Sequence, residues 1–271
     1  MISMKAAFIS ADVLSGFLIS LEQPLTTVDQ NLSTVGGVYT ADEWRQTRIK
    51  GYNKIGDDGS EISNNQKYLG RMFSTERRKL LAALSLAENF DFSRYSSILE
   101  IGCGEMIQAF VIKNSFPHIR YCATDLDSYI IEKCSQLSVL DSIEKGTFNI
   151  LDGDSEKFEG ADLVIGWGVE YAIDRKNLLE FFRSAGDHSV PVLLCTQQII
   201  GIVRYASRFI RTRGFHANSL AKKGVRLHGW VRSFRFWRKI ADHANMHMKI
   251  IRSPSTQIGG QANYFWLLFE P

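Results

Sequence analysis

Two glycines and a downstream aspartate are the residues of this chain that best indicate chemistry. Gly102 and Gly104 lie in S-I-L-E-I-G-C-G-E-M (97–106), after an apolar run typical of a strand and before a helical pattern. Glycines permit a tight turn and a close approach of the backbone to a ligand, and the N-terminus of the next helix favours an anionic group. Asp125 ends a second strand-like run 21 residues after Gly104, where a carboxylate can accept hydrogen bonds from both hydroxyls of a ribose. The spacing predicts a site for a nucleoside-containing cofactor.

The glycine pattern argues against a dinucleotide. A dinucleotide site would use Gly-x-Gly-x-x-Gly, and this chain has Ile107 at the third position. An ordered set of segments instead resembles the class I S-adenosylmethionine-dependent methyltransferases over residues 75–271. These segments are E-I-G-C-G-E (100–105), T-D-L-D (124–127), G-D-S (153–155), A-D-L-V-I-G-W-G-V-E-Y (161–171) and K-N-L-L-E-F-F-R-S (176–184).

The resemblance implies S-adenosylmethionine (SAM) as the cofactor and S-adenosylhomocysteine (SAH) as the product. No metal site is expected, because the sequence has no tight cluster of cysteine and histidine. It implies that Glu100 orients the turn and helps to hold the α-amino group of the cofactor. The other implied contacts are Gly102, Cys103 and Gly104 with the methionine portion, Asp125 with the ribose, Leu126 with the adenine ring, Asp152 or Asp154 with the exocyclic amine, and Trp167 near the methyl donor.

The chain departs from the family pattern at two places near the expected chemistry. Many relatives carry glycine or alanine where this chain has Met106, and many carry Leu-Glu-His where it has Val169-Glu170-Tyr171. A hydroxyl acceptor usually needs a general base, and without the frequent histidine several side chains are candidates. These catalytic candidates are Glu170, Tyr171, His216 and His228; the other histidines, His118, His188, His243 and His247, are expected at the surface or at a strand edge.

Strand and helix patterns alternate along most of the chain. Strands are predicted over 97–101, 120–124, 148–151, 161–166 and 190–195, and a terminal antiparallel pair over 248–252 and 264–269. Helices are predicted over 75–89, 105–113, 129–137, 176–184, 198–212 and 231–244. Such alternation produces a parallel sheet covered on both faces. We therefore expect an α/β three-layer sandwich with a seven-stranded, mostly parallel sheet, the last strand antiparallel, and an N-terminal extension.

Composition and length fit this architecture. The 271 residues are 45% hydrophobic and 23% charged, which excludes a disordered chain, a collagen-like repeat and a disulfide-rich miniprotein. We expect residues 1–73 to form an N-terminal extension or substrate cover and residues 74–271 to form the cofactor-binding domain. Within the extension, Tyr68 and Arg71 are placed to close over the cofactor.

The cysteines and the apolar runs favour a cytoplasmic protein. Four cysteines, Cys103, Cys122, Cys134 and Cys195, form no C-x-x-C pair and no cluster with histidine, so we expect reduced, buried thiols. No apolar run reaches the length of about 18 residues that a membrane-spanning helix needs. Asp12 interrupts the apolar stretch near the N-terminus, which argues for a folded element rather than a signal peptide.

The modest net charge of +3 conceals a strongly basic segment. Residues 197–252 hold thirteen lysines and arginines and a single acid, Asp242. This segment therefore carries +12, and the rest of the chain carries −9. Its two predicted helices are amphipathic, and Arg232, Arg235 and Lys239 are expected to line one side of the second. The charges are either solvated helix faces, a lid over 197–246 that attracts an anionic substrate, or a membrane-surface contact. Nucleic acid is a less favoured partner, because no RNA-binding module is recognisable.

These features together predict a SAM-dependent methyltransferase. The favoured acceptor is a small or glycan-type anionic molecule, methylated on oxygen. An RNA or protein methyltransferase that uses the basic segment 197–252 is one alternative. A cofactor-binding scaffold without catalytic activity is the other.

Overall fold

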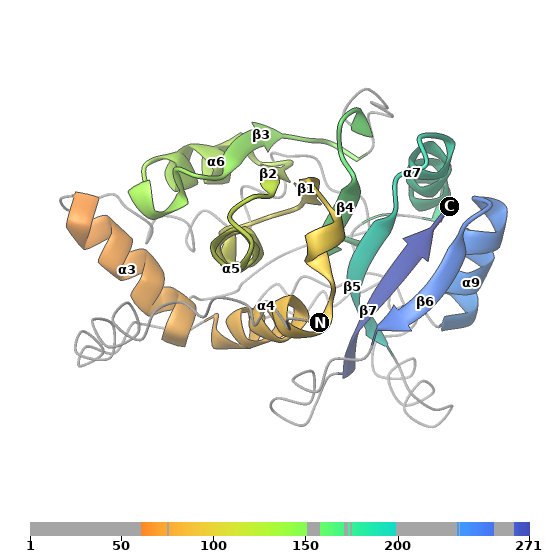
Figure 1. Ribbon diagram of the computed structural model, residues 1–271, viewed down its shortest axis with the longest axis horizontal. Helices are drawn as coiled ribbons and strands as arrows, with labels where there is room; N and C mark the ends of the chain where they lie inside the picture. Colours follow the sequence, from red (N-terminus) through yellow and green to blue (C-terminus); the bar gives the residue numbers. More distant parts are fainter. Residues whose placement is uncertain are drawn as a thin grey trace, which may run out of the picture.

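One mixed sheet forms the frame of the molecule, which we describe from a computed structural model (Figure 1). The structure describes residues 61–74, 76–150, 158–170, 173, 175–198, 232, 234–251 and 263–271. Within these residues the strands are β1 (Ser97–Ile101), β2 (Arg120–Asp125), β3 (Glu144–Thr147), β4 (Leu163–Trp167), β5 (Val192–Gln198), β6 (His247–Ile251) and β7 (Asn263–Glu270). The helices are α3 (Glu61–Ser74), α4 (Arg77–Asn89), α5 (Ile107–Ser115), α6 (Ser128–Ser135), α7 (Arg175–Asp187) and α9 (Phe234–His243), with short 3₁₀ turns at Phe92–Arg94 (η1) and Ser138–Leu140 (η2).

The strand order confirms the predicted fold class. The seven strands are ordered β3-β2-β1-β4-β5-β7-β6. The first five are parallel, and β7 runs antiparallel to both β5 and β6. The order reverses between β1 and β4, so the carboxyl ends of these neighbouring strands form a switch point, where open α/β sheets bind their ligands.

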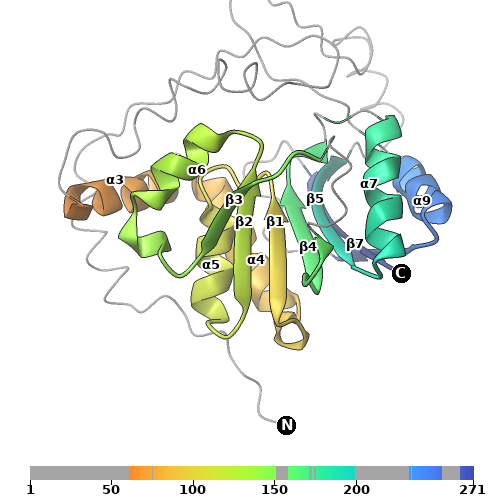
Figure 2. The same ribbon diagram turned by 90° about the horizontal axis from the view of Figure 1, so that it is seen from above.

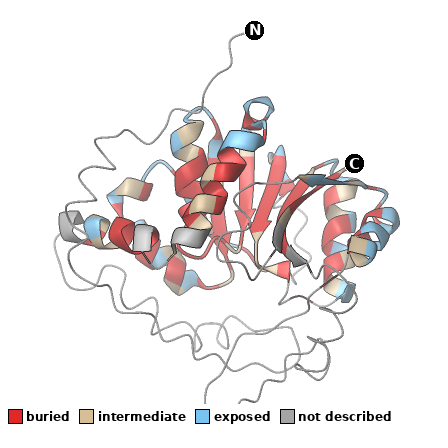
Figure 3. Cartoon of the chain, turned by 90° about the horizontal axis from the view of Figure 1, so that it is seen from below, coloured by how far each residue is buried: buried red, intermediate tan, exposed pale blue. Residues whose placement is uncertain are grey.

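Helices cover both faces of the sheet (Figure 2). On one face, Ile98, Tyr121 and Ile165 pack with side chains from α3, α4, α5 and α6. On the other, Leu99, Val164 and Phe269 pack with α7 and α9. Figure 3 shows the central strands buried throughout, with exposed residues on the outer sides of the helices. Because β4 is buried on both faces, its sequence is a continuous apolar run rather than an alternating one.

The predicted third strand, 148–151, was wrong. The strand is Glu144–Thr147, and Phe148 follows it, buried, with its N–H donated to the Asp125 carbonyl at 3.0 Å. Strand β3 lies at the edge of the sheet and pairs only with β2. Its sequence E-K-G-T is half-exposed and polar, so the hydrophobic pattern that identifies central strands is missing.

Two helix predictions also need comment. Helix α3 was not predicted, because its sequence lies partly in the stretch of weak periodicity before residue 67. The predicted helix 198–212 lies outside the described residues except for Gln198, which belongs to β5. In the part of the chain that the structure describes, every helix is too short or too polar to span a bilayer.

Candidate cofactor and active site

The turn after β1 has a backbone shape that few residues adopt. Gly102, Gly104 and Met106 have φ values of +64°, +53° and +57°, all in the left-handed region. Glycine adopts this region without a steric penalty, whereas methionine does not. Met106 is fully buried and immediately precedes α5, which begins at Ile107 rather than at residue 105 as predicted. The turn thus contains two glycines that adopt the left-handed conformation without strain and one methionine that is strained by it.

Gly102 has a packing reason to be glycine. A Cβ added there would lie 1.9 Å from Cγ1 of Val169, in the segment that follows β4. That segment approaches closely because Gly168 has a φ of +66° and its N–H donates to the Cys195 carbonyl at 3.4 Å. The glycine therefore allows the ends of β1 and β4 to meet.

Asp125 is fixed by the turn and lies at the end of β2. Its Oδ2 accepts from the Gly104 N–H at 2.9 Å, and its Oδ1 accepts from the Asp127 N–H at 3.0 Å. The side chain is buried. The glycine turn and the aspartate that the sequence linked by spacing are therefore in direct contact. Leu126, the residue next to Asp125, is half-buried.

Glu100 lies in β1 beneath the turn, on the face covered by α4 and α5. Its Oε2 accepts a hydrogen bond from the Tyr121 hydroxyl at 3.1 Å, and the side chain is 2% exposed. Burial, with a smaller contribution from the nearby charge of Asp125, raises the pKa of Glu100 from 4.5 to about 8. The carboxyl is therefore mainly protonated at neutral pH. Its expected contact with the α-amino group of the cofactor stays a prediction.

Trp167 ends β4 beside this turn. It is half-buried, pairs in register with Cys195 of β5, and meets Trp266 edge-to-face at 5.9 Å between ring centroids.

Two cysteine thiols lie against the turn at Gly104. Cys103 and Cys134 both direct their sulfur atoms at the Gly104 carbonyl, at 3.7 and 3.9 Å, and burial raises the pKa of both thiols.

The segment after β4 carries the catalytic candidate that the structure describes. Glu170 is buried, and its backbone carbonyl accepts a hydrogen bond from Nη1 of Arg232. Nη2 of Arg232 donates to the carbonyl of Ile173. The guanidinium also lies 5.0 Å from the ring centroid of Phe236 and 5.8 Å from that of Trp237.

The prediction for Arg232 was therefore wrong. It was expected on the charged side of a helix together with Arg235 and Lys239. The structure places it before the first residue of α9 and buries it, whereas Arg235 and Lys239 are exposed. Its guanidinium donates hydrogen bonds to backbone carbonyls of the segment after β4 and does not lie on a solvated helix face.

Other predicted site residues lie outside the described residues, namely Asp152, Asp154, Tyr171, His216 and His228. The four remaining histidines, His118, His188, His243 and His247, are exposed as expected. All four cysteines are free; three are buried and Cys122 is half-buried. No group of three metal-binding side chains is present among the described residues.

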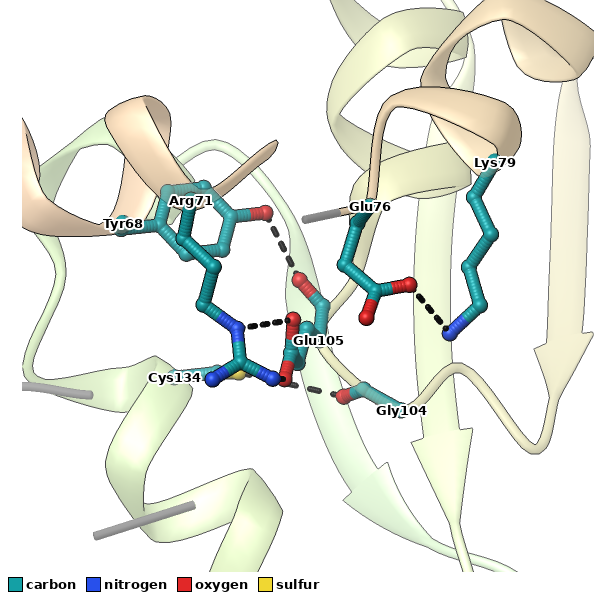
Figure 4. A network of polar contacts seen from close by, with 7 residues as sticks. All are labelled: Tyr68, Arg71, Glu76, Lys79, Gly104, Glu105 and Cys134. Carbon is teal, nitrogen blue, oxygen red and sulfur yellow. Dashed lines mark hydrogen bonds and ion pairs between the residues drawn. The ribbon is translucent and has the colours of Figure 1, made fainter. Parts of the chain in front are cut away.

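Sequence reasoning missed Glu105, the residue between the two left-handed positions 104 and 106. The structure directs both Tyr68 and Arg71 at Glu105 (Figure 4). Their closing over the cofactor stays a prediction. The three-residue spacing of Tyr68 and Arg71, which places both on one face of a helix, was the available signal.

The architecture matches solved structures of methyltransferases. PigF with SAH has a TM-score of 0.56 and 13% identity, with 86% of this chain and 70% of that chain covered. An O-methyltransferase family protein from Burkholderia thailandensis has a TM-score of 0.56 and 14% identity, covering 96% and 67%. Human N-acetylserotonin methyltransferase in complex with SAM has a TM-score of 0.53 and 16% identity, covering 86% and 63%. This chain has the class I methyltransferase fold.

The overall sequence identity to these solved structures is low, at 13–16%. No protein-family model matches the chain, and no curated protein sequence matches it. The class I methyltransferase fold places the turn of residues 102–106 and Asp125 at the carboxyl ends of β1 and β2, beside the switch point.

Proposed function

We propose that the protein binds SAM at the carboxyl ends of β1, β2 and β4 and transfers its methyl group to an acceptor. The observation that carries this proposal is the contact between the Gly104 N–H and the Asp125 carboxylate. This contact joins a tight, left-handed turn to a buried acid at the switch point of the sheet. The residues present fit an adenosyl cofactor, because a carboxylate at the end of the second strand can accept hydrogen bonds from the ribose hydroxyls.

The remaining residues have distinct roles in this proposal. The backbone of residues 102–104 lies against the methionine portion, Leu126 packs on the adenine ring, and Trp167 lies near the reacting methyl. Asp152 or Asp154 accepts from the exocyclic amine. The bound cofactor supplies an electrophilic methyl group for an in-line displacement, which depends mainly on the placement of the nucleophile.

An oxygen of a small anionic molecule is the acceptor that we favour. The similar solved structures include proteins described as O-methyltransferases, and the basic segment would attract phosphate or carboxylate groups. A hydroxyl acceptor would lose its proton to a nearby base. Glu170 is the best-placed described candidate, because it follows β4 directly and its backbone is fixed by Arg232. Tyr171, His216 and His228 are the other candidates.

An RNA or protein acceptor is the second candidate function. The net charge of +12 over residues 197–252 supports it, since each phosphate contact adds to a salt-dependent affinity. Binding to RNA that weakens steeply with salt, without turnover of sugar phosphates, would favour this alternative over a small-molecule acceptor.

Calorimetry with SAM and SAH tests the cofactor site. We expect binding at tens of micromolar or tighter in the wild type, and a loss of at least tenfold in affinity in Asp125→Asn, which keeps the size of the side chain. Asp187→Ala, at the exposed end of α7, is the control and should bind normally. A folded wild type that binds neither ligand would refute the proposal.

A screen of acceptor libraries that detects SAH tests the reaction itself. Turnover of one acceptor identifies the substrate class. It also excludes the inactive scaffold, which would bind SAM and release no SAH with any acceptor. Glu170→Gln should retain SAM binding and lose turnover by about 10²–10⁴-fold if Glu170 is the base.

A further inference from the structure

Helix α3 contacts the cofactor turn through two side chains that both engage one residue. Arg71 binds the Glu105 carboxylate in a two-pronged ion pair, with Nε 3.1 Å from Oε2 and Nη2 2.5 Å from Oε1. The Tyr68 hydroxyl donates to the Glu105 backbone carbonyl at 2.7 Å. Both partners of the ion pair are buried. Figure 4 shows the tyrosine and the arginine on the same side of α3, above the turn. Helix α3 thus binds both the side chain and the backbone of Glu105.

Other contacts fix α3 to the rest of the domain. Tyr68, Leu69 and Met72 belong to the core on the face of the sheet that α4 and α5 cover. The ring of Tyr68 meets Phe110 of α5 edge-to-face at 6.4 Å. Near the start of the helix, the Asn65 side-chain amide donates to the Ser138 hydroxyl at 2.8 Å. The helix is therefore a rigid support.

The residue held by α3 lies where the turn is strained. Glu105 stands between Gly104 and Met106, both left-handed. A non-glycine residue keeps such a conformation only when its surroundings impose it. Where a glycine at position 106 would adopt this shape freely, this sequence has a buried methionine, and the neighbouring residue is bound in three hydrogen bonds.

We infer that Arg71 and Tyr68 are positioning residues for the cofactor: through Glu105 they hold the turn 102–106 in its binding shape. In this role α3 compensates for the missing glycine at Met106. The inference rests on the proposed SAM site, and it makes cofactor affinity depend on residues 61–74, which precede the segments whose sequence resembles methyltransferases.

The contacts of Arg71 and Tyr68 with Glu105 are called the clamp below. The test removes the clamp without leaving a buried charge. Loss of one partner alone strands the other and is strongly destabilising, whereas replacing a buried pair by apolar side chains is often tolerated. The main variant is therefore the double substitution Arg71→Met with Glu105→Met, and the milder one is Tyr68→Phe. The control is Glu76→Gln with Lys79→Met, which removes the neighbouring 3.1 Å ion pair of Figure 4 and leaves the contacts of Glu105 in place.

Calorimetry with SAM is the first measurement. We expect at least tenfold weaker binding in the double variant, a smaller loss in Tyr68→Phe, and no change in the control, at melting temperatures close to that of the wild type. A folded double variant that binds SAM within twofold of the wild type overturns the clamp and leaves the proposed function intact. Absence of binding in the wild type overturns the function instead.

Amide hydrogen exchange in the absence of SAM tests the clamp independently of the cofactor. The amides of Gly104, Glu105 and Met106 should exchange faster in the clamp variants than in the wild type and the control. Equal exchange rates in all of these proteins would contradict the inference.

A substitution at position 106 tests the strain directly. In the double variant, Met106→Gly should recover part of the lost SAM affinity, because glycine adopts the left-handed shape without support. Met106→Ala removes a similar volume and keeps the penalty, so it should recover nothing. Equal affinities with glycine and alanine would refute the link between strain and clamp.

Discussion

The guanidinium of Arg232 donates to the backbone carbonyl of Glu170, a residue 62 positions earlier in the chain. Its second nitrogen donates to the carbonyl of Ile173. These two carbonyls bracket the short segment after β4 that contains two of the catalytic candidates, Glu170 and Tyr171. One buried side chain therefore ties the start of α9 to the segment that would carry the reacting groups.

Loss of this tie should affect catalysis more than cofactor binding. In Arg232→Met two buried carbonyls each lose a donor, and a displacement of about 1 Å near the reacting atoms can cost on the order of 10²-fold in rate. We expect kcat to fall by about 10- to 100-fold, with SAM affinity within about threefold of the wild type. Steady-state kinetics and calorimetry separate the two effects. Arg235→Met, exposed on α9, is the control, and an unchanged kcat in Arg232→Met would exclude a positioning role.

Gly102 should not tolerate a side chain. Gly102→Ala places a Cβ 1.9 Å from Val169 at a φ of +64°. Overpacking costs about 1–3 kcal/mol and the left-handed backbone about 1–2 more. Addition of Val169→Ala should remove the overpacking and leave the backbone penalty. Gly160→Ala provides the comparison, because its φ is +79° and no atom lies within 4 Å of the added Cβ. Denaturant unfolding measures all four proteins, and failure of Val169→Ala to restore stability would contradict the packing explanation.

Glu100 should make the protein less stable as the pH rises. Its pKa is about 8 in the folded chain and 4.5 as the reference value. Between these values the folded chain holds a proton that the unfolded chain has released. The contribution of Glu100 to stability is therefore fully present below about pH 4.5 and is lost as the pH rises toward 8, by at most about 1.4 kcal/mol per pH unit.

Replacement of Glu100 by glutamine should flatten this decline and raise stability near neutral pH. Denaturant unfolding between pH 5 and 8 is the measurement. Asp162→Asn is the control: hydrogen bonds from Ser96 hold the pKa of Asp162 below 3.8, so its removal leaves the slope in this range unchanged. If the free energy of unfolding of Glu100→Gln fell as steeply with pH as that of the wild type, the decline would belong to other titrating groups.

The sequence predicted the central strands and linked the glycine turn to Asp125 because these signals are local. Gly102, Gly104 and Asp125 are recognisable by residue type and spacing, and the central strands are apolar because both faces are buried. Strand β3 was misplaced because an edge strand can be polar. Helix α3 was missed because its first residues, E-I-S-N-N-Q (61–66), are almost all polar and show no clear periodicity.

Two arginines show what residue type cannot predict. Arg232 was assigned to a charged helix face because the periodicity was extended past the true start of α9 at Phe234. Arg71 was expected near the cofactor, but its partner Glu105 follows from the relative placement of two elements 34 residues apart. Such a contact depends on tertiary packing: the spacing of Tyr68 and Arg71 indicates a shared helix face, but not the residue that this face contacts.

The thiols beside the turn have a consequence for chemical labelling. Cys103 adjoins the proposed cofactor site, and such a cysteine would ordinarily be a target for alkylating reagents and mild oxidants. Only the thiolate reacts readily, and burial raises the pKa of Cys103 and Cys134. Iodoacetamide should therefore label neither residue in the native protein, and SAM should give no protection that mass spectrometry could detect. Rapid native labelling of Cys103 would show instead that the turn opens to solvent.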